Sequence, residues 1–129
     1  MGYRSEVYIA IPKKAEKEMD KVFKEHYSDN AWRVDSPFKK YDHTQKWVET
    51  TSFLDGNHTI SKEETFVIYE GSYLKWYEGY EDVVAIKSIA EKHEDDGACI
   101  VCVGEDGQIH SELGEYHEVF NVYTKVELV

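Results

Sequence analysis

Apolar residues recur along the chain with two periods, one typical of strands and one typical of helices. Strict alternation over residues 5–11 places apolar side chains on one face and predicts a half-buried strand. From Pro12 onward the spacing is helical as far as Tyr27, with lysines and glutamates between the apolar positions, which predicts a helix over 13–27. A second helical period predicts a helix over 81–93.

Five further segments are rich in β-branched, aromatic or small apolar residues and are predicted to be strands. They cover residues 45–54, 65–77, 98–103, 108–113 and 119–128. An Asp-Gly pair at 55–56 predicts a tight turn between the first two, and Gly71 indicates a bulge in the second. Residues 28–44 have no clear period, so we expect a long loop in which Trp32 and Phe38 fold back as anchors.

The order of these elements is strand, helix, strand, strand, helix, strand, followed by a terminal β segment. This βαββαβ order predicts a single domain over 1–129 with an α+β, ferredoxin-like fold: an antiparallel sheet, two helices on one face and a C-terminal β extension. We expect the sheet to include 5–11, 98–103 and 119–128. Because the last of these ends the chain and can leave an unpaired edge, we also expect a homo-oligomer, most simply a dimer.

Acidic residues are concentrated in the second half of the chain. Residues 1–62 carry 11 Lys and Arg against 10 Asp and Glu, whereas residues 63–129 carry 4 against 16. Such a field repels nucleic acid and anionic membranes and attracts a basic protein surface, although acidic residues also keep small proteins soluble. No apolar run approaches the roughly 20 residues of a membrane span, and the first residues lack a signal-peptide pattern. We therefore expect a cytoplasmic protein without direct nucleic-acid or membrane binding.

The two cysteines, Cys99 and Cys102, both lie in the apolar segment 98–103. Positions i and i+3 of a strand project to opposite faces, so the two thiols are not expected to meet each other or one metal ion. Redox Cys-x-x-Cys pairs instead lie at the start of a helix. We expect two core cysteines whose role is burial.

Motifs that carry enzymatic chemistry are mostly absent from the sequence. It contains no phosphate-binding glycine loop, no nucleophile elbow and no His-Glu-x-x-His zinc motif. Three pairs resemble the His-x-Thr and His-x-Ser motifs of ferredoxin-like phosphoesterases but lack the intervening residue, so the two side chains would face opposite ways on a strand. These pairs are His43-Thr44, His58-Thr59 and His110-Ser111. We expect no catalysis and no cofactor. A metal-dependent or phosphoesterase-like enzyme is kept as a third hypothesis, after the two binding functions given below.

Four residues near the end of the chain have side chains of the kind that bind divalent ions: His110, Glu112, Glu115 and His117. His110 and Glu112 would share a strand face, and a turn at Gly114 would bring His117 near them. A chain with 6 His and 26 acidic residues forms such neighbourhoods by chance. We interpret the four as solvated hairpin residues and expect no metal.

Aromatic and charged residues crowd around Gly79 within 72–85, where a strand pattern gives way to a helix pattern. Such junctions often display binding groups, because the flanking elements hold the connecting loop still. Aromatic rings beside Lys and Arg suit either contacts to a protein or stacking on a nucleobase. The candidate binding residues are Tyr3, Arg4, Lys75, Tyr77, Glu78 and Tyr80.

Strand alternation would divide the aromatic residues before Gly79 between two faces. Tyr73, Lys75 and Tyr77 would share one face, which we expect to be accessible. Trp76 would lie on the opposite face, which we expect to belong to the core.

Two blocks of the sequence resemble a family of small bacteriophage and prophage proteins of unknown role. The blocks are Met-Gly-Tyr-Arg-Ser-Glu-Val at 1–7 and Lys-Trp-Tyr-Glu-Gly-Tyr-Glu-Asp-Val at 75–83. The family resembles this chain in opening with a Gly-Tyr-Arg-Ser-acid-Val run and in carrying a Lys-Trp-Tyr strand before a helix. The resemblance implies an accessory or counter-defence factor that acts by binding.

Two functional hypotheses follow. The first is a counter-defence inhibitor that binds and blocks a host protein with a basic surface, through an acidic, aromatic-containing surface, in the cytoplasm of an infected bacterium. The second is a sponge that sequesters a nucleotide-type immune signal in a pocket involving Arg4, Lys75 and Tyr77. Net charge favours the first, because a phosphate ligand would have to overcome a repulsive field.

Overall fold

The computed structural model describes residues 4–27, 38–74, 76–114, 119–122 and 126–128. Its strands are β1 (Ser5–Pro12), β2 (Phe38–Phe53), β3 (Gly56–Leu74), β4 (Cys99–Gly104), β5 (Ile109–Leu113), β6 (Phe120–Val122) and β7 (Val126–Leu128). Its helices are α1 (Glu16–Tyr27) and α2 (Glu81–Lys92), with short 3-10 turns η1 (Lys13–Ala15) and η2 (Glu94–Asp96). Neither described helix has the length and apolarity that crossing a membrane requires.

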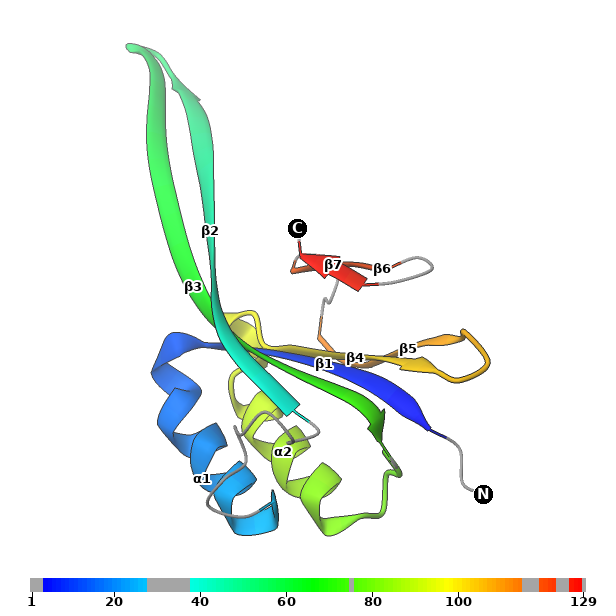
Figure 1. The fold of residues 1–129 in the computed structure, drawn as a ribbon. Coiled ribbons are helices and arrows are strands. Elements are labelled where there is room, and N and C mark those ends of the chain that lie inside the picture. The colour runs from blue at the N-terminus through cyan, green and yellow to red at the C-terminus, as the bar shows by residue number, and fades with distance from the viewer. Residues whose placement is uncertain (1–3, 28–37, 75, 115–118, 123–125, 129) are drawn as a thin grey trace.

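Five strands form one antiparallel sheet in the order β2-β3-β1-β4-β5. Helices α1 and α2 lie together against one face of this sheet (Figure 1). The predicted α+β architecture, with an antiparallel sheet and two helices on one face, is confirmed. The helices predicted over 13–27 and 81–93 are confirmed within a few residues at each end.

The sheet has a hydrophobic core on each face. One core fills the space between the sheet and the helices and contains Ile9, Phe23 and Tyr69, all fully buried. The other lies on the opposite face, where Val119 and Phe120 pack over the central strands. A sheet buried on both faces explains why β4 reads as a continuous apolar run.

The two cysteines of β4 belong to different cores, as the sequence predicts. Cys99 lies in the core that contains Phe120, and Cys102 lies in the core under the helices. Neither cysteine forms a disulfide bond, and burial raises the pKa of Cys102 to about 12. A thiol with so high a pKa stays protonated and unreactive in the folded protein.

Strand β2 begins at Phe38, so the prediction of a loop reaching residue 44 is wrong. Phe38 is buried, as an anchor should be, but as the first residue of a strand. The polar residues Lys40 and Asp42 obscured the strand pattern: Lys40 is partly buried by its ion pair with α1, and Asp42 is exposed and ion-pairs with η1. Trp32 lies outside the described residues.

Strand β3 begins at Gly56, nine residues before the predicted start, and ends at Leu74. The tight turn predicted at 55–56 is found one residue earlier, at 54–55, and is followed by Gly56 at a φ of 125°. The bulge at Gly71 is also confirmed, because Ser5 pairs with Leu74 whereas Val7 pairs with Gly71, which leaves an extra residue on β3. A Cβ atom at position 71 would overlap the side chains of Leu74 and Phe38, so any larger residue would force these side chains to move.

The C-terminal β extension is not a strand of the main sheet. β6 and β7 pair with each other in a separate two-stranded sheet, which corrects the prediction of one strand over 119–128. The place beside β4 is taken by β5, so the outer strands of the main sheet are β2 and β5. The extension instead packs on the face opposite the helices (Figure 1).

Candidate functional site

The loop between β3 and α2, where the sequence predicts a binding site, is held by backbone hydrogen bonds. The Tyr80 N–H donates to the Tyr77 carbonyl at 3.0 Å, and the Val84 N–H donates to the Tyr80 carbonyl at 2.9 Å. The first turn of α2 is tied to α1, because the Tyr27 hydroxyl donates to Asp82 at 2.6 Å. Hydrogen bonds therefore hold the backbone of residues 77–80, from which the side chains project.

This loop displays an aromatic and acidic surface. The rings of Tyr77 and Tyr80 meet edge to face, with centroids 5.1 Å apart. Tyr80 is 44% exposed and Val84, one turn further along α2, is 50% exposed. Glu78 and Glu81 are exposed beside them. We call these five residues the junction patch.

The structure places the other predicted residues of this region differently. Trp76 packs partly against the core under the helices, as expected, and its indole nitrogen has no hydrogen-bond partner among the described residues. Tyr77 and Glu78 lie beyond the end of β3, in a turn, so strand alternation does not set their directions. Tyr3 and Lys75, and the side chain of Tyr73, lie outside the described residues.

Arg4 lies in a different hollow from the junction patch. This hollow of about 350 Å³ is lined by Arg4, Ser5, Glu6, Ser72, Val103, Gly104, Glu105 and Gly107. The Arg4 N–H donates to the Glu105 carboxylate at 2.7 Å, and its carbonyl accepts from the Glu105 N–H at 3.0 Å. Among the described lining residues, one arginine faces two glutamates, a balance that does not favour a phosphate.

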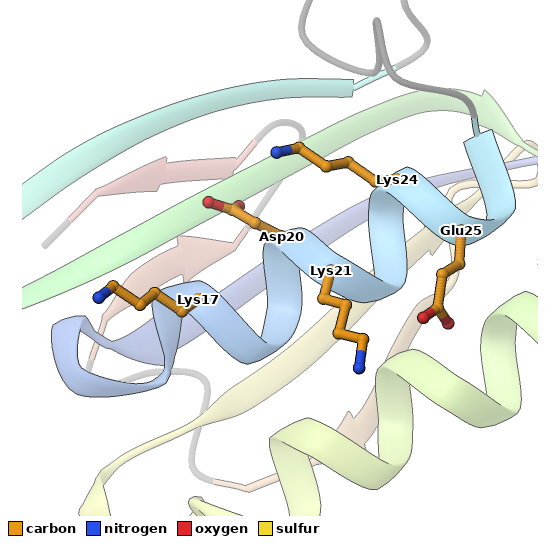
Figure 2. Close-up of a pocket in the computed structure, with 5 residues that line it drawn as sticks. All are labelled: Lys17, Asp20, Lys21, Lys24 and Glu25. Carbon is orange, nitrogen blue, oxygen red and sulfur yellow. The ribbon is translucent and has the colours of Figure 1, made fainter.

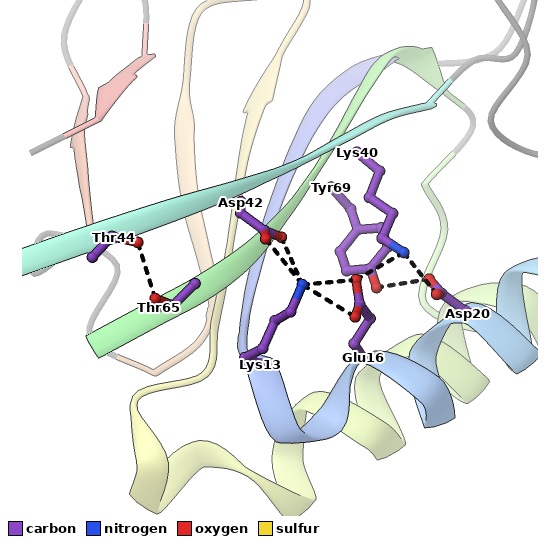
Figure 3. A network of polar contacts seen from close by, with 8 residues as sticks. All are labelled: Lys13, Glu16, Asp20, Lys40, Asp42, Thr44, Thr65 and Tyr69. Carbon is purple, nitrogen blue, oxygen red and sulfur yellow. Dashed lines mark hydrogen bonds and ion pairs between the residues drawn. The ribbon is translucent and has the colours of Figure 1, made fainter. Parts of the chain in front are cut away.

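A network of ion pairs and hydrogen bonds, which the sequence did not reveal, joins η1 and α1 to β2 and β3 (Figure 3). The Lys40 ammonium lies 2.7 Å from Asp20 and 3.0 Å from Glu16. The Lys13 ammonium lies 2.9 Å from Asp42 and 3.2 Å from Glu16. The sequence does contain the charged residues of this network, at alternate positions on β2 and at helical spacing on α1. Which of them pair with each other can be seen only in the folded structure.

The buried end of this network is Tyr69, whose hydroxyl donates to Asp20 at 3.0 Å. Burial, followed by the charge of Asp20, raises the pKa of Tyr69 well above its ordinary value. Burial alone would lower the pKa of Lys40, but hydrogen bonds to Asp20 and Glu16 outweigh burial and raise it. The network thus holds its charges in fixed pairs at the place where β2 leaves the body.

The network makes stability depend on acid pH. The hydrogen bond from Lys40, and then that from Lys13, lowers the pKa of Glu16 below its ordinary value of 4.5. The unfolded chain therefore binds protons more readily, so this contribution is present above pH 4.5 and is lost as the pH falls below that value. We expect the urea midpoint to fall between pH 5 and pH 3, and less steeply in Lys40→Met. An equal slope in the two proteins would contradict this assignment.

Beyond the network, β2 and β3 continue as an isolated ribbon, residues 44–65, which we call the arm. β3 pairs with β1 only from Phe66 onward, so among the described strands those of the arm pair only with each other. The Thr44 and Thr65 hydroxyls, 2.9 Å apart, mark the start of the arm (Figure 3). It projects far from the body and curves away from the helices (Figure 1).

A hollow of about 430 Å³ on the outer side of α1 carries no site. It is lined by Lys17, Asp20, Lys21, Lys24 and Glu25. Figure 2 shows that these side chains come from one helix and diverge, with Lys17 and Lys24 pointing away from Lys21 and Glu25. Asp20 is already engaged by Lys40 and Tyr69. The described side chains do not converge on a ligand position.

The described residues form no site for either enzymatic alternative, the phosphoesterase or the metal-dependent enzyme. His43 lies on β2, His58 near the arm tip with Asp55 at 3.1 Å, and His110 on β5. Among the described residues, no group of three or more His, Cys, Asp or Glu could hold a metal ion. Glu112 instead accepts from Lys87 at 2.8 Å, while Glu115 and His117 lie outside the described residues.

Comparisons with known proteins do not assign the chain to a family. No protein-family model matches the sequence, and no curated protein matches it. Among solved structures, GlnK of B. subtilis resembles the chain with a TM-score of 0.41 and 12% sequence identity, over 86% of this chain and 98% of that one. Similarity at this level does not indicate a function for this chain, so the function is inferred from the candidate site.

Proposed function

We propose that this protein is a non-enzymatic, phage-type accessory protein with a ferredoxin-like fold, a counter-defence inhibitor that binds and blocks a host protein. The junction patch is the observation that carries the proposal. It combines two tyrosines in contact, an exposed valine and two exposed glutamates on a loop held by backbone hydrogen bonds. Exposed aromatic residues on a rigid support are the usual anchors of protein interfaces.

The charge of the surrounding surface indicates the chemistry of the partner. α2 continues from the junction patch to η2, and along it Glu91, Glu94 and Asp95 are exposed. This acidic surface would accelerate association with a basic protein and would repel nucleic acid. The proposed partner is therefore a host protein with a basic surface, met in the cytoplasm of an infected bacterium.

The alternative, a sponge for a nucleotide-type signal, is supported by Arg4 in its hollow. Of the described lining residues, however, Glu6 and Glu105 place two carboxylates beside this one guanidinium. Tyr77 and Tyr80, the rings that would stack on a base, do not line that hollow. These positions favour the inhibitor over the sponge.

The test compares two charge reversals of equal size on the same helix region. Glu78→Lys/Glu81→Lys alters the junction patch, and Glu91→Lys/Glu94→Lys makes the same change at the other end of α2. Wild-type protein and both variants are used to capture host proteins, and the affinity of the captured protein is measured by calorimetry. We expect at least tenfold weaker binding for the first variant and a smaller loss for the second, because a hot spot is local.

Two results would contradict the proposal. Equal weakening by both reversals would show that net charge acts rather than the junction patch. Tight calorimetric binding of a nucleotide by the wild-type protein, together with no captured protein, would favour the sponge. Trp76→Ala serves as the control for destabilisation. It should lower the free energy of unfolding by roughly 3–5 kcal/mol, because the side chain packs against the core under the helices.

A further inference from the structure

The outer edge of β2 is the longest edge that the sheet presents among its described strands. β2 runs for 16 residues, from Phe38 to Phe53, and contains no proline. β3 pairs with it in continuous register on one side, and no described strand lies on its other side. Proteins usually keep such edges short, or interrupt them with proline, bulges or charged residues, because a long edge strand pairs readily with another chain. β2 has only the charged residues, so these decide what can pair with it.

A second copy of β2 can lie along this edge in a limited set of registers. When two identical strands pair antiparallel about a two-fold axis, each residue lies opposite the residue of the other copy that is equally distant from the axis. The side chains of such partners project from the same face of the joined sheet. The residue on the axis lies opposite itself, so the position of the axis fixes every other pair.

One register brings the charged residues of β2 together with opposite signs. With the axis at Thr44, Asp42 falls opposite Lys46 of the second copy. In the same register Lys39 falls opposite position 49, which is Glu49 in the sequence. Symmetry makes each of these pairs occur twice, and no two like charges are opposite one another. Directly opposite charges stabilise an antiparallel strand pair.

The other long registers lack this match. An axis at position 43 sets Lys40 opposite Lys46, and an axis at position 46 sets Lys46 opposite itself. Axes at 45, 47 and 48 bring no two charged residues together. With the axis at 44, these are all the registers that pair eleven or more residues of β2. Because like charges directly opposite one another are destabilising, charge selects the register centred on Thr44.

The described side chains that this register uses are accessible. The side chain of Asp42 is 51% exposed and that of Lys46 is 76% exposed. Asp42 can keep its ion pair with Lys13 and still accept from a second lysine, since a carboxylate has two oxygens. Lys46 contacts Glu63 only loosely, at 3.6 Å, and Lys39 is exposed. The pairing therefore does not require any contact within one copy to be broken.

We infer that β2 pairs antiparallel with β2 of a second copy, about a two-fold axis at Thr44. Residues 38–50 of each copy take part, and the two five-stranded sheets join into one. Residues 45–50 of each arm then lie along residues 38–43 at the edge of the other body. A two-stranded ribbon is marginally stable in water, and a third strand stabilises it. The length of the arm is thus explained by the edge of the second copy that it follows.

This interface is separate from the other surfaces of the molecule. It differs from the dimer predicted at 119–128, because β6 and β7 pair with each other in a sheet of their own. It is also distinct from the junction patch, which follows the opposite end of β3 from the arm tip. The inference therefore does not rest on the proposed function.

A cysteine on the axis tests the register directly. Opposite residues of an antiparallel pair have Cα atoms about 4.5–5.5 Å apart, within the range of about 4.4–6.8 Å that a disulfide spans. Under mild oxidation, Thr44→Cys should therefore give a covalent pair at twice the 15.1 kDa mass on a non-reducing gel. Thr65→Cys is the matched control, because it removes the other hydroxyl of the same hydrogen bond. Position 65 lies one strand further from the axis, so its two copies would be about 14 Å apart and should not link.

The wild-type chain completes this experiment. We expect it to sediment as a dimer at tens of micromolar and to stay unlinked under oxidation, because Cys99 and Cys102 are buried. A monomeric wild type, no covalent pair in Thr44→Cys, or equal linking of Thr44→Cys and Thr65→Cys would overturn the inference.

A charge exchange tests the same register without a disulfide. Positions 39 and 49 are used because Asp42 also holds Lys13. Lys39→Glu and Glu49→Lys each set like charges opposite one another at two places, so each should raise the Kd of the dimer roughly tenfold in sedimentation equilibrium. Combining them exchanges the charges and should return the Kd to within about threefold of the wild type. Unchanged Kd values in the single variants, or no recovery in the combined one, would contradict the register.

Discussion

Replacing Phe23 by Ala is expected to lower the free energy of unfolding by about 3–5 kcal/mol. The Phe23 ring is fully buried, stacks on Tyr69 at a centroid distance of 4.9 Å and meets the edge of Phe38 at 4.8 Å. α1 contributes Phe23 while β3 and β2 contribute its neighbours, so truncation leaves a cavity where three elements meet. Urea denaturation followed by circular dichroism measures the change.

Lys24→Ala provides the control for this measurement, because Lys24 follows Phe23 on α1 and is exposed. Its replacement should change stability by no more than about 0.5 kcal/mol. If Phe23→Ala were as stable as Lys24→Ala, the core under the helices would have to be packed differently from the arrangement described.

Removing the Asp20 carboxylate is expected to cost roughly 1–3 kcal/mol, the penalty for leaving a buried donor without a partner. Tyr69 is fully buried and donates its hydroxyl to Asp20, and Lys40 loses its shortest ion pair in the same change. The free energy of unfolding of Asp20→Ala, again from urea denaturation, should therefore fall well below that of the wild type.

A double-mutant cycle separates the two partners of Asp20. In a Tyr69→Phe background no hydroxyl is left unsatisfied, so Asp20→Ala should cost less than it does in the wild type. Asp20→Asn keeps an acceptor and should fall between the wild type and Asp20→Ala. Equal costs in the two backgrounds would mean that the hydroxyl of Tyr69 finds another partner when the carboxylate is absent.

The sequence was most informative where burial dictates the residue type. β1 was recognised by its alternation and β4 by its continuous apolar run, because the two cores cover the faces of these strands. The helices were recognised equally well, because each buries one stripe of apolar residues against the sheet. The placement of Cys99 and Cys102 in different cores followed from strand geometry alone.

The sequence was least informative where polar residues form strands. Residues 56–63 of β3 are all exposed, so this half of the arm lacks the apolar alternation by which strands are recognised, whereas the other half was predicted over 45–54. At the base of the arm, Lys40 and Asp42 are strand residues whose partners Asp20 on α1 and Lys13 on η1 lie 20 and 29 residues away along the chain. Local pattern contains no information about such partners.

The candidate site was predicted in part. The aromatic content around Gly79 indicated a surface, and Tyr77, Glu78 and Tyr80 do gather there. Arg4 was grouped with them because the first strand was expected to lie beside the junction. The structure places Arg4 against Glu105 of the β4–β5 turn instead. Neighbours across a sheet depend on strand order, which no short motif specifies.

The division of the cysteines between two cores gives the protein a native reporter on each side of its sheet. Cys102 can be reached by a thiol reagent only when the helices separate from β4, whereas Cys99 can be reached only when Phe120 and its hairpin lift away. Local opening of each layer has its own free energy, which labelling rates reveal. The labelling rates of the two thiols in the unmodified chain therefore show which layer opens first.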